Sequence, residues 1–139
     1  MTVGGFHHVG ILVEGFDDVR RVLGDCLGLD IAEPEAEPDL GIEIMWARVG
    51  EVALEFIRPL SPDTRAAAAL RAGQGGVHHV AFAVDDLDRA LDEVRAAGLE
   101  TVDPEPRDGS HGSRIAFIAP DSVGGTLVEL LEPRRPDVL

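Results

Sequence analysis

Apolar residues recur at helical spacing in two stretches of the chain, and a glycine follows each stretch. A spacing of three or four residues predicts an amphipathic helix with one buried face. The face of the first predicted helix consists of Phe16, Val19, Leu23, Cys26 and Leu27, followed by Gly28. The face of the second consists of Leu87, Ala90, Leu91 and Val94, followed by Gly98. Asp85 or Asp86 is expected to cap the second helix, because aspartate readily accepts a hydrogen bond from an N–H of the first turn.

The segments around the two helices are also alike. FHHVGILV starts at Phe6 and VHHVAFAV starts at Val77, and each predicts a strand. A short strand is expected after each helix, near residues 29–32 and 99–102, and a hairpin after that. The hairpins pair 42–49 with 51–58 around Gly50, and 114–118 with 125–131 around Gly124 and Gly125. Residues 33–39 are expected to form a loop, and residues 64–71 a turn or two of helix.

This order predicts two βαβββ repeats, at residues 5–60 and 77–133, joined by a connection over residues 61–76. The fold class is therefore α+β, with a mostly antiparallel sheet.

Four chemically reactive residues fall at equivalent places in the two repeats. His8 and His79 lie in the first strand of each repeat, and Glu55 and Glu129 lie in the last strand. Alternation along the strands puts the large apolar side chains on the opposite face from the histidines, whose own face carries small residues. A single strand histidine is more often a hydrogen-bonded core or edge residue, and a single strand glutamate more often faces solvent. The repeated pattern instead favours one divalent metal ion held by all four residues.

The composition excludes some classes of function. The formal net charge is −14 and the chain has no lysine, which argues against binding to nucleic acid or to anionic membranes. No apolar stretch is long enough to span a bilayer and no signal peptide is evident, so a cytoplasmic protein is expected. Cys26 is the only cysteine, and we expect a buried structural thiol rather than a nucleophile.

Several motifs resemble one known family across nearly the whole chain. They include HHVGILV, GIEIMWARVG, GQGGVHHVAFAVDDLDRAL and DPEPRDGSHGSRIAFIAPDSVGGTLVELLEP. The chain resembles the vicinal-oxygen-chelate (glyoxalase/bleomycin-resistance) superfamily, and most closely the methylmalonyl-CoA epimerases. The resemblance implies one domain over residues 1–139, a cupped sheet and a homodimer. It also implies that His8, Glu55, His79 and Glu129 bind the metal, with Co²⁺ expected and Mn²⁺, Ni²⁺, Fe²⁺ or Zn²⁺ as alternatives.

The same resemblance implies an enzyme that epimerises a malonyl-type acyl-CoA thioester by removing its α-proton. The family's acid–base glutamate falls on Glu43, and Glu129 is the candidate for the other face of the substrate. A solvent-facing hairpin glutamate is the alternative for Glu43. Substrate contacts are expected from Arg107, Ser110, His111 and Arg114, although an ordinary turn and solvated arginines would explain the same residues.

Two departures from the family pattern keep other functions open. The first helix lacks the usual tyrosine, and Ala119-Pro120-Asp121 stands where family members often have His-Pro-Lys. One alternative is another metal-dependent isomerase, lyase or dioxygenase of specialised metabolism. The other is a non-catalytic binding or resistance protein.

Overall fold

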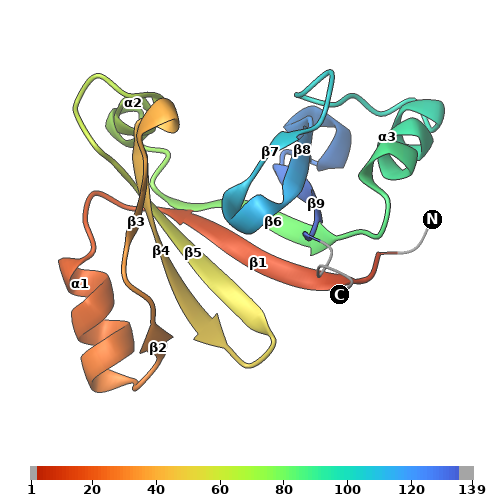
Figure 1. Cartoon of the computed structure of the whole chain (residues 1–139). Helices are drawn as coiled ribbons and strands as arrows, with labels where there is room; N and C mark the ends of the chain where they lie inside the picture. Colours follow the sequence, from red (N-terminus) through yellow and green to blue (C-terminus); the bar gives the residue numbers. More distant parts are fainter. Residues whose placement is uncertain (1–2, 135–139) are drawn as a thin grey trace. The chain divides into compact units, whose positions relative to one another are not determined.

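The computed structural model describes residues 3–134, which divide into two compact units (Figure 1). Unit 2 is the continuous stretch His8–His78, and unit 1 combines the residues up to His7 with those from His79 onwards. The chain therefore passes from one unit to the other twice, once within strand β1 (Gly5–Leu12) and once within strand β6 (Gly76–Ala83).

Unit 2 is built around the long hairpin of β4 (Ile42–Val49) and β5 (Val52–Pro59). Strand β5 pairs in parallel with β1, and the short strands β2 and β3 pair antiparallel with β4. The remaining elements of this unit are α1 (Asp17–Val19), the π-helix η1 (Arg20–Cys26), β2 (Asp30–Ile31), β3 (Glu35–Glu37), the 3₁₀ helix η2 (Pro38–Leu40) and α2 (Arg65–Arg71).

Unit 1 repeats this plan. Its last strand, β9 (Val128–Glu132), pairs in parallel with β6 and antiparallel with β8 (Arg114–Ile118). The other elements are α3 (Leu87–Ala96), β7 (Arg107–Asp108) on the edge of β8, and the 3₁₀ helices η3 (Ser110–Gly112) and η4 (Pro120–Val123). In both units a strand is followed by a helix, and the last strand returns beside the first. The α+β class and the two βαβββ repeats are confirmed.

Helix α3 covers one face of the unit 1 strands. Leu87, Ala90 and Leu91 are buried against Ala116 and Leu130. Each fully buried leucine contributes about 1.5–3 kcal/mol to folding. The helix starts where Asp86 Oδ1 accepts a hydrogen bond from Arg89 N (3.1 Å), which settles the choice between Asp85 and Asp86.

Two apolar clusters occupy the two faces of the unit 2 hairpin. Phe16, Met45, Ala47 and Phe56 pack together on the face that α1 covers. Leu12, Ile44 and Ile57 pack on the other face with α2, which Thr64 caps by accepting a hydrogen bond from Ala67 N. The predicted helix over residues 64–71 and the hairpin around Gly50 are confirmed. No helix in the described part of the chain is long and apolar enough to cross a bilayer.

The prediction for Cys26 is wrong: its side chain is exposed. The first predicted helix continues as a π-helix after Val19, and the N–H of Leu27 donates to the carbonyl of Val22, five residues earlier. A π-helical turn takes more residues than an α-helical turn, so the apolar face shifts out of phase. Leu23 still packs on the core, but Leu27 is 63% exposed.

Three boundaries also differ from the predictions. Residues 33–39 are not simply a loop, because β3 pairs with β4; its Glu-Ala-Glu sequence at a sheet edge carries no apolar pattern that would mark it. Residues 99–102 contribute only a bridge from Thr101 to Ile118, and the edge strand β7 comes later. The second hairpin contains η4, so β9 begins at Val128 rather than at residue 125.

Candidate functional site

Unit 2 buries a histidine beside a glutamate. His8 Nε2 lies 3.8 Å from Glu55 Oε1, with side chains 1% and 9% exposed. In the register of β1 and β5, Gly10 is opposite Glu55, so His8 and Glu55 are diagonal neighbours on one face. Trp46 is opposite Glu55 on β4, and its ring meets the His8 imidazole edge-on at 5.2 Å.

Unit 1 buries the same pair in the same way. His79 Nε2 lies 3.2 Å from Glu129 Oε2, with side chains 3% and 6% exposed. Here Ala81 is opposite Glu129 in the parallel register of β6 and β9. Phe117 is opposite Glu129 on β8, and its ring meets the His79 imidazole edge-on at 5.5 Å.

The two pairs therefore share a local design of imidazole, carboxylate, aromatic ring and small residue. The predicted small residues are found on β1 and β6, where Gly10 and Ala81 are opposite the carboxylates, but Trp46 of β4 and Phe117 of β8 place large rings on the same face. Sequence patterns missed Trp46 and Phe117, because a cross-strand contact is visible only once the register of the strands is known. Burying a carboxylate is costly unless a partner compensates its charge. Imidazole nitrogens with carboxylate oxygens form a donor set that fits a divalent transition metal.

Glu43 lies in a different environment from Glu55. Glu43 is opposite Arg58 in the β4–β5 register, whereas Trp46 is opposite Glu55. Positions three residues apart on a strand point to opposite faces. The side chain of Glu43 is thus on the face of Met45 and Phe56, opposite to that of Glu55, and the structure does not bring the two carboxylates together.

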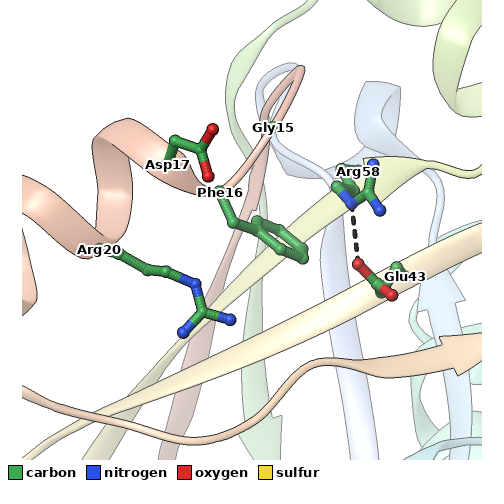
Figure 2. A pocket seen from close by; sticks show the side chains of 6 residues that line it. All are labelled: Gly15, Phe16, Asp17, Arg20, Glu43 and Arg58. Carbon is green, nitrogen blue, oxygen red and sulfur yellow. Dashed lines mark hydrogen bonds and ion pairs between the residues drawn. The ribbon is translucent and has the colours of Figure 1, made fainter.

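On that face, Arg58 Nε donates a hydrogen bond to Glu43 Oε1 (2.8 Å). The pair borders a pocket of about 320 Å³ that Gly15, Phe16, Asp17 and Arg20 also line (Figure 2). The Arg58 guanidinium lies over the Phe16 ring, 5.4 Å from its centre. Neither Arg58 nor Arg20 was expected at a site, because nothing in the linear sequence links them to Glu43.

The predicted substrate-binding arginines lie on different faces of unit 1. Arg107 is opposite Ile115, so it shares the face of Phe117, and its guanidinium lies 5.3 Å from the centre of that ring. Arg114 is on the other face, where two of its nitrogens bond the Asp88 carboxylate at 3.1–3.3 Å. The hydrogen bonds to Asp88, together with the charges of Asp88 and Glu132, raise the pKa of Arg114.

Ser110 and His111 form a tight turn before β8. The carbonyl of Ser110 accepts hydrogen bonds from both the N–H and the hydroxyl of Ser113. His111 has a left-handed backbone (φ 58°, ψ 35°), the one positive φ of a non-glycine residue in residues 3–134. Such backbone strain occurs often at functional sites, but it does not identify a function by itself.

Comparison with known proteins identifies the family. Residues 7–117 match the model of the Glyoxalase/Bleomycin resistance protein/Dioxygenase superfamily, and the chain belongs to this superfamily. It is 30% identical to the ethylmalonyl-CoA/methylmalonyl-CoA epimerase of Cereibacter sphaeroides over 92% of this chain and 97% of that protein. It is 34% identical to the uncharacterized protein YqjC of Bacillus subtilis, over 91% of each chain.

A solved structure supports the same grouping. The chain resembles a variant of Streptomyces coelicolor methylmalonyl-CoA epimerase in complex with 2-nitronate-propionyl-CoA, with a TM-score of 0.87 and 26% identity. The similarity covers 96% of this chain and 100% of that chain. The predicted superfamily and its glyoxalase-like fold are therefore confirmed.

Proposed function

We propose that this protein is a metal-dependent epimerase of a malonyl-type acyl-CoA thioester. The observation that carries the proposal is the matching pair of buried histidine and glutamate side chains in each repeat. The similarity to methylmalonyl-CoA epimerases adds the reaction class and the acyl-CoA substrate.

The metal ligands in this proposal are His8, Glu55, His79 and Glu129. His8, His79 and Glu129 are buried groups that could hold a metal ion, and Glu55 completes a set with one pair from each repeat. Two carboxylates balance the charge of a divalent ion, which makes their burial affordable. Co²⁺ is the expected ion, with Mn²⁺, Ni²⁺, Fe²⁺ or Zn²⁺ as alternatives. A bound ion of this kind supplies Lewis acidity that stabilises negative charge developing on a carbonyl oxygen.

The side chains of this protein would bind the substrate and move its proton. Epimerisation removes a proton from the α-carbon on one face and returns a proton on the other. A carboxylate removes such a proton best where water is excluded, and Glu129 is 4% exposed. Glu43, the predicted group for the other face, lies on the opposite face of the β4–β5 hairpin from Glu55 and bonds Arg58 there. The proposal therefore relies on Glu129, and substitution of Glu43 tests its predicted role.

Arg107 and the Ser110–His111 turn are the proposed substrate contacts. Arg107 shares the Phe117 face, which is also the face of Glu129. Its Nε pairs with Asp103 Oδ1 at 3.4 Å, so the terminal nitrogens of the guanidinium are the groups suited to a carboxylate or phosphate of the substrate. Arg114, also predicted as a contact, would have to give up its hydrogen bonds to Asp88 first.

Exchange of the α-proton with D₂O tests the proposal directly. Methylmalonyl-CoA, ethylmalonyl-CoA and malonyl-CoA are incubated with the protein, with and without EDTA, and deuterium uptake is followed by NMR. We expect exchange on at least one substrate, a loss of about 100-fold or more with EDTA, and recovery with Co²⁺. Absence of exchange by the Co²⁺-loaded protein on all three substrates, or exchange indifferent to EDTA, contradicts the proposal.

Single substitutions then assign the carboxylates. Glu129→Gln is expected to abolish exchange and to weaken metal binding. Glu43→Gln is expected to leave exchange and metal content nearly unchanged, because its carboxylate lies on the hairpin face opposite to Glu55. A loss of about 100-fold, the usual contribution of a general base, would instead support the role predicted for Glu43.

A second candidate is a different metal-dependent enzyme of the superfamily, such as a dioxygenase. The observation that favours it is Ala119-Pro120-Asp121 at the start of η4, where family members often carry His-Pro-Lys. Oxygen consumption by the Fe²⁺-loaded protein would identify a dioxygenase. A non-catalytic binding protein fits less well, because both buried histidine–glutamate pairs are retained.

A further inference from the structure

The pocket beside Glu43 lies apart from the proposed metal ligands and is lined by charged side chains. It lies within unit 2, between the start of the first helix and the β4–β5 hairpin, on the face opposite to Glu55 (Figure 2). Its volume of about 320 Å³ is at the lower end of the range for small-molecule sites. Two of its lining residues are arginines, in a chain whose formal net charge is −14.

Arg58 is held in a fixed orientation with its outer edge unused. Its Nε bonds Glu43, and its guanidinium lies over the Phe16 ring. In the described part of the chain, no hydrogen bond engages its two terminal nitrogens. Those nitrogens form the planar edge that matches a carboxylate or a phosphate in a bidentate contact.

Arg20 is the second cation of the pocket. Its side chain is half-buried, and among residues 3–134 no ion pair or hydrogen bond engages its guanidinium. The neighbouring Arg21, by contrast, is exposed and pairs with Asp18. A partly desolvated guanidinium without a partner is unfavourable, so an anion in the pocket would be stabilised there.

The acidic residues of the pocket do not cancel its preference for an anion. The charge of Glu43 is already compensated by Arg58. Asp17 is exposed to water at the start of α1, where the free N–H groups of the first helical turn favour a carboxylate. The groups that lack partners are therefore the guanidinium edges, and Phe16 supplies an apolar wall beside them.

We propose that this pocket binds the oxyanion of a small molecule, a carboxylate or a phosphate group, through Arg20 and the terminal nitrogens of Arg58. The site is separate from the proposed metal ligands, because His8 and Glu55 lie on the other face of the same hairpin. Its occupation requires neither a metal ion nor the epimerase reaction.

Binding of three probes tests the site. Inorganic phosphate, malonate and coenzyme A are titrated separately into the full chain, by calorimetry and by amide NMR, with and without EDTA. We expect at least one probe to bind and to shift the amide signals of Gly15 and Phe16, whether or not EDTA is present. The three arms distinguish a free phosphate, a dicarboxylate and the phosphates of a larger cofactor.

A matched pair of variants gives the decisive comparison. Arg20→Gln is expected to weaken binding about tenfold, the usual effect of losing one charge-assisted hydrogen bond. Arg21→Gln, which removes the adjacent arginine outside the pocket, should change it less than about twofold. Both positions lie on the helix surface, and thermal melts verify that both variants fold.

Three results would overturn the proposal. One is that no probe binds at millimolar concentration. Another is that Arg20→Gln and Arg21→Gln weaken binding equally. The third is binding that EDTA abolishes and that shifts signals around His8 instead of Gly15, which would support the metal site and leave this pocket without a ligand.

Discussion

At the scale of single residues, the sequence is enough to predict the two histidine–glutamate pairs but not the Glu43–Arg58 pair. The equivalence of His8 with His79 and of Glu55 with Glu129 needs only the repeat and the alternation of strand faces. The partner of Glu43 needs the exact register of a hairpin. A turn centred on Gly50 would place Glu43 opposite Ile57, whereas the turn at Gly50 and Glu51 places it opposite Arg58. A one-residue shift in register exchanges an apolar partner for a cation.

The Glu43–Arg58 pair is expected to contribute modestly to stability. A double-mutant cycle with Glu43→Gln and Arg58→Gln should give a coupling free energy of about 0.5–1 kcal/mol, because the side chains are 22% and 36% exposed. Urea unfolding at low and high NaCl measures it, and the coupling should shrink as salt screens the charges. A coupling near zero at low salt would show that the pair does not form in solution.

At the scale of elements, the two helical segments show where a shared sequence pattern stops predicting a shared structure. In α3 the predicted face is buried as expected, from Leu87 to Leu91. In the first repeat the same spacing continues into a π-helix, and the predicted face ends at Leu23. Near the end of this helix, Leu23 packs in the same cluster as Ile31 of β2. Helical periodicity alone does not contain that tertiary contact.

The cap of α3 gives a test with a built-in control. Asp86→Ala removes the acceptor for Arg89 N and should lower the free energy of unfolding by about 1 kcal/mol. Asp85→Ala removes an exposed neighbour and should change it by less than about 0.5 kcal/mol. Chemical denaturation of both variants checks the difference, and equal losses would contradict the assignment of the cap.

The π-helix predicts an accessible thiol at Cys26. In native protein, one equivalent of a thiol reagent such as DTNB should react at a rate within about tenfold of that in urea, since the side chain is exposed. A continued α-helix would instead bury Cys26 against the core. Native labelling that is slower by several orders of magnitude would contradict the helical geometry described here.

At the scale of the whole molecule, sequence predicted the α+β class and the two repeats but not where the compact units divide. The sequence predicts repeats at residues 5–60 and 77–133. The units instead divide inside β1 and β6, so residues 5–7 of the first predicted repeat belong with the second. Gly4 N donates to Ala83 O, and the Phe6 ring contacts Phe82 at 5.6 Å. Pairing between distant segments decides which unit a strand end joins. Local sequence patterns do not predict that pairing.

If the proposed ligands hold a metal ion, metal loss must lower the stability of the folded chain. With free Co²⁺ at about 100 times its dissociation constant, binding adds about 2.7 kcal/mol, so chelation should lower the melting temperature by about 10 °C. Differential scanning calorimetry with EDTA and with added Co²⁺ measures this shift. His79→Ala should melt like the chelated protein with or without metal, whereas His78→Ala, which alters the exposed neighbouring histidine, should keep the metal-dependent shift.

The double passage of the chain between the units has a mechanical consequence. Unit 2 is inserted into unit 1, because the chain enters it after His7 and leaves it before His79. A stretching force on the two ends of the molecule is therefore applied first to unit 1, across the contacts of Gly4 and Phe6 with the end of β6. Unit 2 bears no tension until those contacts break, so a pulling experiment should record unit 1 yielding before the residues from His8 to His78 extend.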